Sequence, residues 1–105
     1  MATTSKALFR GAATTTTTTV LYTVPALTTA VVTNIAVTNT ASTAATFTIG
    51  MGPAAGQISL HTTTAIAANS TAYIDLKQVL ATTNTITGGA SAATVSFHIS
   101  GVEIA

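Results

Sequence analysis

The chain has 105 residues, only 5% of them charged, and its three basic and two acidic side chains give a formal net charge of +1. Three basic groups cannot neutralise the several phosphates that a nucleic-acid site contacts, so the composition argues against DNA or RNA binding. The absence of cysteine excludes both a disulfide framework and a thiolate metal site.

Threonine and alanine dominate the composition, with 26 and 21 copies. Valine, isoleucine, leucine and phenylalanine together make up 25 of the 105 residues, which exceeds the roughly 20% below which disorder is expected. One domain with a small core is therefore predicted. Soluble monomers usually carry about 25–35% charged residues on the surface. Because this chain cannot reach that level, we interpret it as a subunit of an assembly.

No targeting or membrane segment is recognisable in the sequence. Threonine, asparagine or glycine interrupts every apolar run before the roughly 18 residues of a spanning helix are reached. The first ten residues also lack the apolar stretch of about 7–15 residues that a secretory signal needs. The sequence therefore predicts a soluble protein that is not exported by a visible signal and has no membrane partner, and nothing in it conflicts with folding in the cytoplasm.

Residues 1–19 differ in composition from the rest of the chain. They contain six consecutive threonines, Thr14–Thr19, together with two of the three basic residues and few large apolar groups. β-Branched threonine favours an extended chain over a helix, and chain termini are often unpinned. The segment is expected to be either a flexible tail or an extended arm that reaches a neighbouring subunit.

On the second interpretation, the natural anchors of the arm are Leu8, Phe9 and Arg10, which are the predicted partner-binding residues. The arm would lie along an exposed strand edge of the neighbour. Deletion of residues 2–19 would then weaken partner binding and leave the rest of the chain, 20–105, folded.

From Val20 onward, apolar and polar residues alternate, and turn residues separate the alternating runs. A period of two is typical of half-buried strands. The residues expected to share a face within each strand are, in chain order, Val20, Tyr22 and Val24; Val31, Thr33, Ile35 and Val37; Ala45, Phe47, Ile49 and Met51; Ile58 and Leu60; Ile66; Ala72, Ile74 and Leu76; Ile86; and Val95, Phe97 and Ile99. The glycines of Gly50–Gly52 and Gly88–Gly89 are expected in turns.

The last strand contains a break in its pattern. Continued alternation after Ile99 would place Gly101 and Glu103 inside, although the apolar residues there are Val102 and Ile104. A bulge at Ser100–Gly101 would return the two apolar side chains to the core.

Seven or eight short strands and no segment with a helical period predict an all-β fold. The expected architecture is an antiparallel two-sheet β-sandwich over residues 20–105, with a jelly-roll or an immunoglobulin-like strand order.

The sequence offers few groups for catalysis. Asp75 and Glu103 are the only side-chain carboxylates, and both are expected on exposed strand positions, too far apart for an acid–base pair. His61 and His98 could bind zinc only together with one of these carboxylates, and their spacing matches no zinc motif. No catalytic residue, metal site or cofactor is therefore predicted.

Three weaker patterns have simpler structural explanations. Ser96 and Ser100 flank His98 without a nucleophile elbow or an oxyanion-hole motif. Tyr22 and Tyr73 could form a sugar platform but are expected to pack on the sheets. The T-x-T pairs lack the fixed repeat of ice-binding solenoids.

Three phrases of the sequence can be read together: Leu21–Pro25 leading into Thr29–Ile35, Ile66–Thr71 before Ile74–Leu76, and the ending Ala93–Ile104. Together they resemble small β-sandwich virion proteins of tailed bacteriophages. Such families usually have glycine where this chain has Leu27. The likeness covers residues 20–104 and rests on structural phrases, not on a catalytic signature.

The resemblance implies a non-enzymatic virion structural protein without a cofactor. The expected role is a head decoration subunit on the capsid surface, bound to the major capsid protein and to itself, most simply as a homotrimer. A tail or tail-fibre module that binds a host receptor or glycan is the alternative.

Overall fold

The computed structural model describes residues 3–53 and 58–105, and every regular element in them is a β-strand. The strands are β1 (Thr3–Ala12), β2 (Val20–Thr23), β3 (Thr29–Asn39), β4 (Ala45–Gly52), β5 (Ile58–Ile66), β6 (Ser70–Leu80), β7 (Thr85–Ala90) and β8 (Val95–Ile104). The described residues contain no helix that could cross a membrane.

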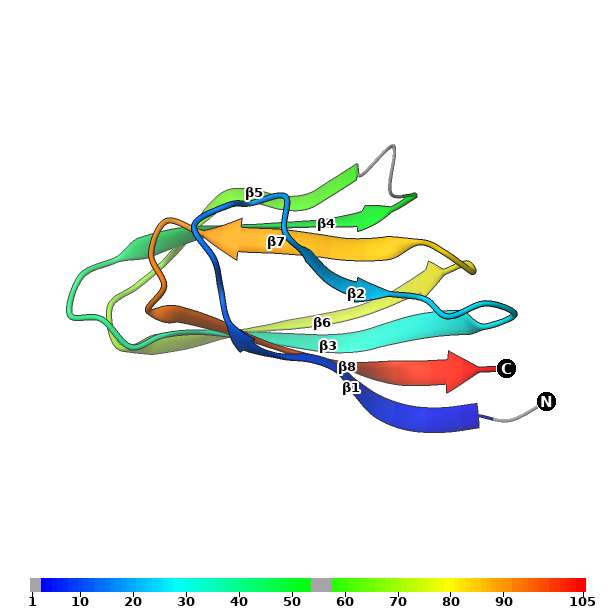
Figure 1. Cartoon of the computed structure of the whole chain (residues 1–105). Helices are drawn as coiled ribbons and strands as arrows, with labels where there is room; N and C mark the ends of the chain where they lie inside the picture. The colour runs from blue at the N-terminus through cyan, green and yellow to red at the C-terminus, as the bar shows by residue number, and fades with distance from the viewer. Residues whose placement is uncertain (1–2, 54–57) are drawn as a thin grey trace.

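The strands form two four-stranded antiparallel sheets that pack face to face (Figure 1). The order is β1-β8-β3-β6 in the first sheet and β2-β7-β4-β5 in the second. Each strand of the first half of the chain pairs antiparallel with a strand of the second half: β1 with β8, β2 with β7, β3 with β6 and β4 with β5. This order is that of a jelly roll. It confirms the predicted sandwich and selects between the two strand orders that the sequence left open.

The core lies between the sheets and consists of alternate residues from both. The largest fully buried side chains include Phe97, Ile35, Ile49, Ile86 and Ile99. The rings of Phe47 and Phe97 meet edge to face across the core, with centroids 6.2 Å apart. The alternation predicted for β4 and for the first half of β8 is therefore confirmed.

Strand β3 does not keep a single face toward the core. Its register against both neighbours shifts between Val32 and Asn34. Val32 is therefore buried before the irregularity and Ile35 after it, while Thr33 is exposed and Val31 only half-buried. The prediction that Val31, Thr33, Ile35 and Val37 share one face is therefore wrong for Val31 and Thr33, which are not buried with Ile35 and Val37.

The predicted bulge in β8 at Ser100–Gly101 is also wrong. β8 keeps its alternation of burial through Gly101, and the irregularities lie in its two neighbours, at Leu8 of β1 and Thr33 of β3. Gly101 is buried between them, while Val102 and Ile104 lie on the outer face and are only half-buried. Glu103 lies on the inner face of the strand, as Ile99 and Gly101 do.

The glycines that were expected in turns lie inside strands. Gly88 and Gly89 are buried in β7. A Cβ on Gly88 would lie 2.8 Å from the carbonyl oxygen of Thr48, and one on Gly89 would collide with the carbonyl oxygen of Thr16. β7 has room only for hydrogen at these positions because two other backbone segments pass close to it.

The N-terminal segment does not form a separate arm within the described residues. Thr3–Ala12 is β1, an edge strand paired with β8 of the same chain from Thr3↔Ile104 to Ala12↔Ser96. The threonine run that follows is hydrogen-bonded to β7, where Ala90 N–H donates to Thr14 O and Gly88 N–H to Thr19 O, each at 2.9 Å. β1 is extended, but the threonine run forms a bend and a turn. Residue 19 marks no boundary, because β8 already supplies the edge on which β1 pairs.

Candidate partner-binding surface

The three residues predicted to bind a partner lie together on β1, but in different environments. Leu8 is buried in the core at the register shift of β1. Its Cδ1 atom lies so near Gly101 that a Cβ on this glycine would be only 2.9 Å away. Phe9 is half-buried and packs against the core. Arg10 is exposed, on the outer face of the first sheet. Leu8 is thus an anchor within its own sandwich, whereas Phe9 and Arg10 reach the surface.

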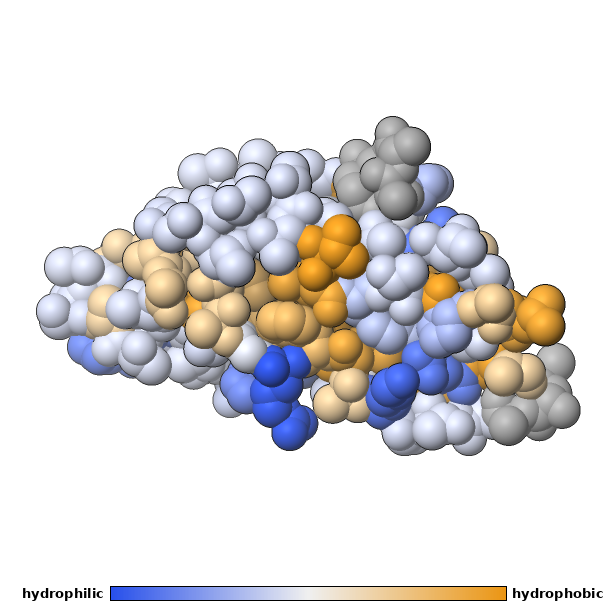
Figure 2. Space-filling model, viewed as in Figure 1, coloured by the Kyte–Doolittle hydropathy of each residue, from blue (hydrophilic) through white to orange (hydrophobic). Residues whose placement is uncertain are grey.

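The side of the molecule where β1 faces β2 exposes apolar surface. β2 has only four residues, so it covers little of this side. Val20 is 55% exposed, and Leu21 and Phe9 are partly buried against the core. Figure 2 shows hydrophobic side chains gathered in the middle of this face, with strongly hydrophilic residues along its β1 side. We call Phe9, Arg10, Val20 and Leu21 the β1–β2 surface.

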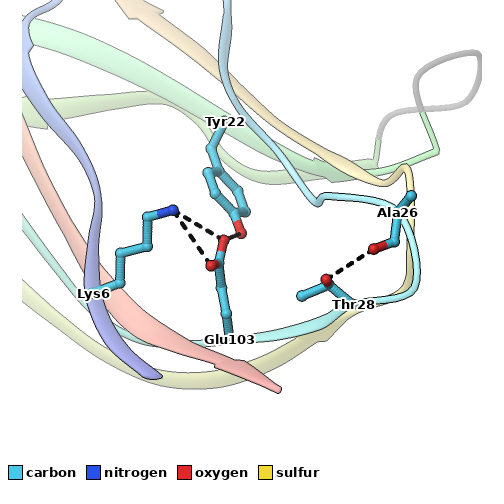
Figure 3. A network of polar contacts seen from close by, with 5 residues as sticks. All are labelled: Lys6, Tyr22, Ala26, Thr28 and Glu103. Carbon is cyan, nitrogen blue, oxygen red and sulfur yellow. Dashed lines mark hydrogen bonds and ion pairs between the residues drawn. The ribbon is translucent and has the colours of Figure 1, made fainter. Parts of the chain in front are cut away.

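A three-residue polar cluster links β1, β2 and β8 near the chain termini (Figure 3). The ammonium group of Lys6 donates to both carboxylate oxygens of Glu103, at 3.3 Å each. The hydroxyl group of Tyr22 donates to Glu103 Oε2. Because Tyr22 belongs to the second sheet and the other two residues to the first, the cluster ties the two sheets together. Sequence reasoning placed Glu103 on an exposed position, whereas its side chain is only 15% exposed.

The pKa values of the cluster follow from these contacts. The hydrogen bond from Tyr22 lowers the pKa of Glu103, and Lys6 lowers it further, against the opposing effect of burial. Burial raises the pKa of Tyr22, and so do the hydrogen bond to Glu103 and its negative charge. The folded state therefore favours an ionised Glu103 beside a neutral Tyr22.

This arrangement predicts a stability maximum between the two titrations. The contribution of Glu103 is complete above its ordinary pKa of 4.5 and is lost as the pH falls through the lowered value. The contribution of Tyr22 is complete below its ordinary pKa of 10.0 and is lost as the pH rises above it. Thermal melts should show stability falling both at acidic pH, where Glu103 is protonated, and at alkaline pH, where Tyr22 ionises. Glu103→Gln should remove the fall at acidic pH and lower the free energy of unfolding by about 1 kcal/mol near neutral pH. An unchanged acid limb in Glu103→Gln would contradict the assignment.

Asp75, His61 and His98 lie on three different strands. Asp75 accepts a hydrogen bond from Asn34 Nδ2 at 3.1 Å on the outer face of the first sheet. His61 is half-buried on β5, with its ring 5.6 Å from that of Phe47. His98 is exposed on β8. Among residues 3–53 and 58–105, no three His, Cys, Asp or Glu side chains are close enough to hold a metal ion.

The outer face of the first sheet carries the exposed groups that sequence reasoning missed. Tyr73, expected to pack on a sheet, is 74% exposed on β6. Val79 is 69% exposed there and lies in one cross-strand row with Val31 and Val102. A shallow hollow of about 520 Å³ opens nearby, lined by Thr33, Asp75, Leu76 and Lys77. The outward position of Val31 could not be foreseen, because it depends on the register shift at Thr33.

Tyr22 and the turn after β2 complete the comparison with the expected sites. Tyr22 is buried, so it offers no platform for a sugar. Leu27, which stands where related sequences were expected to have glycine, is 91% exposed and has a positive φ of 56°. The turn thus keeps the left-handed conformation that favours glycine, although the residue is leucine.

Comparison of the sequence with protein-family models and with curated proteins found no match. Similar solved structures come from particles of infectious bursal disease virus. The T13 viral particle matches with a TM-score of 0.56 and 10% identity, over 97% of this chain and 30% of the other. The VP2 subviral particle matches with a TM-score of 0.54 and 12% identity, over 97% and 32%.

The chain therefore spans about a third of the length of these viral proteins. At such low identity the likeness concerns the fold alone. This chain has the jelly-roll sandwich that occurs in proteins of virus particles.

Proposed function

We propose that the chain is a non-enzymatic structural protein of a virion. The observation that carries this proposal is the eight-stranded jelly roll, which nearly the whole chain forms and which is similar to sandwiches in virus particles. The low charge of the chain agrees with a role in contact formation.

Within the virion, the proposed role is a head decoration subunit on the capsid surface. Its partner would be the major capsid protein, and a homotrimer would raise the avidity because the second and third contacts become intramolecular. The β1–β2 surface is the proposed contact, since it combines an exposed cation, Arg10, with partly exposed apolar side chains. Interfaces are commonly enriched in aromatic residues and arginine.

A tail-associated module that binds a host receptor or glycan is the second candidate. The observation that favours it is the exposed ring of Tyr73 on the same strand as Asp75 and the hollow. Aromatic rings with an apolar face and a polar edge are suited to such surfaces.

The copy number of the chain in purified particles distinguishes the two roles. Quantitative mass spectrometry against the major capsid protein should find a number comparable to the shell lattice if the chain decorates the head. A handful of copies per particle would favour the tail-associated role, and absence from particles would refute both.

The contact surface is tested by adding purified variants to particles that lack the chain. Arg10→Glu and Val20→Asp should weaken particle binding about tenfold or more. The first reverses the charge of the exposed cation, and the second places a negative charge among the apolar side chains of the contact. Thr62→Glu, which adds a charge at an exposed position of β5, away from this surface, is the control. Equal binding by all variants would exclude the β1–β2 surface.

A further inference from the structure

The two sheets leave four edge strands, and three of them are poorly suited to pairing with another chain. β2 has four residues and a register shift. β1 is interrupted at Leu8. β5 has two register shifts, and its Thr63 has a positive φ of 48°. Short or distorted edges of this kind prevent strands of different molecules from pairing.

The fourth edge, β6, differs in length and in exposure pattern, although its register against β3 also shifts, between Asp75 and Gln78. It has 11 residues, and none of them has a positive φ. Exposure alternates without interruption over most of its length. Its outward residues are Thr71, Tyr73, Asp75, Lys77 and Val79, and its inward apolar residues Ala72, Ile74 and Leu76 are only partly buried. β6 is thus a long edge whose side chains alternate in exposure from Ser70 to Lys77, with partly exposed apolar side chains beside it.

The charges on β6 are arranged symmetrically about Leu76. Asp75 precedes this residue and Lys77 follows it, both pointing outward. In an antiparallel pair, residues directly opposite each other lie on the same face of the sheet. If two copies of β6 pair around a twofold axis at Leu76, Asp75 of each lies opposite Lys77 of the other.

Other registers lack this complementarity. Pairing centred on Asp75 or on Lys77 would place like charges opposite each other, which is destabilising. A shift by one residue in the pairing would bring outward side chains opposite inward ones and bury the wrong face. Among centres within the charged stretch, only Leu76 joins opposite charges.

We propose that β6 pairs antiparallel with β6 of a second copy of this chain, centred on Leu76, so that the first sheets of the two molecules form one continuous sheet. The contact is isologous, as twofold interfaces are. It is independent of the proposed capsid binding, and it uses a different edge from the β1–β2 surface, so a threefold arrangement through other surfaces is compatible with it.

The same register also matches the apolar groups. Tyr73, which is 74% exposed, lies opposite Val79 of the second copy, which is 69% exposed. On the inner face, the two Leu76 side chains meet and cover each other's exposed side. The hollow lined by Thr33, Asp75, Leu76 and Lys77 lies at the twofold axis. The largest exposed side chains of β6 are thereby covered in pairs.

The test is a charge exchange measured by sedimentation equilibrium of the full chain. The wild type should form dimers. Asp75→Lys and Lys77→Asp should each raise the dimer dissociation constant about tenfold or more, because each replaces two attractive cross-strand pairs by two repulsive ones. The double variant Asp75→Lys/Lys77→Asp should restore the wild-type constant. Thr62→Glu, which adds a charge at an exposed position of β5 in the second sheet, is the control that should leave it unchanged.

Circular dichroism of each variant checks that the sandwich remains folded, and rescue by the double variant cannot arise from a folding defect. A wild type that stays monomeric, dimers insensitive to the single reversals, or a double variant no better than the single ones would each overturn the proposal. Failure of the wild-type chain to bind particles while it still forms dimers would refute the capsid contact and leave this inference standing.

Discussion

Replacing Gly101 with alanine is expected to destabilise the sandwich by about 3 kcal/mol or more, near the upper end of the range for overpacked cores. β8 is a central strand, with β1 on one side and β3 on the other. A Cβ at this position would collide with the carbonyl oxygen of Val31 and lie 2.9 Å from Leu8 Cδ1. Backbone in a paired central strand cannot move aside without loss of its own hydrogen bonds.

Thermal unfolding measures this effect. For a domain of this size, the melting temperature should fall by about 12 °C or more. Gly11→Ala is the matched control, because a Cβ there would meet only the ring of Phe9, at an ordinary distance of 3.4 Å. Equal stability of the two variants would mean that the close approach of β3 to Gly101 is absent in solution.

Removal of residues 2–12 is expected to abolish the cooperative unfolding transition. The deletion takes away β1, and with it the buried side chain of Leu8 and the ion pair between Lys6 and Glu103. Burial of one leucine side chain contributes about 1.5–3 kcal/mol, against a total stability of about 5–15 kcal/mol for a typical domain. The loss also leaves β8 with an unpaired edge that invites aggregation.

A shorter deletion of residues 2–4 provides the control, because it ends before Lys6 and Leu8. It should keep a cooperative transition. If the chain without residues 2–12 unfolds as the full chain does, β1 is an appendage, and the expectation of a separate arm is correct after all.

The consequence for functional work is that the arm deletion foreseen from the sequence is unsuitable as a test of partner binding. A variant that loses β1 would lose binding because it is unfolded. Point substitutions at Arg10 and Val20 avoid this difficulty, since both side chains are exposed. They test the contact itself.

The sequence alone was sufficient to predict the fold class, an antiparallel two-sheet β-sandwich. The alternation of Ala45, Phe47, Ile49 and Met51 and that of Val95, Phe97 and Ile99 are visible without any coordinates, and the structure buries both sets. Strand periodicity is local, because successive side chains of a strand point to opposite faces whatever its partners are. The turn residues between the runs also mark where most of the strands end, because a turn depends on the residues within it.

The tertiary structure alone decided the strand order, the faces at the irregular positions and the surface that remains for partners. Thr33 reverses the face of β3, and Gly101 tolerates the approach of both neighbouring strands, because β1, β3 and β8 must fit side by side. Glu103 is inward for the same reason and finds Lys6 and Tyr22 there. Nothing near any of these residues in the chain signals the contact, since its partners come from strands distant in sequence. The pattern within a strand is thus determined by local stereochemistry, and the pairing between strands by packing across the whole fold.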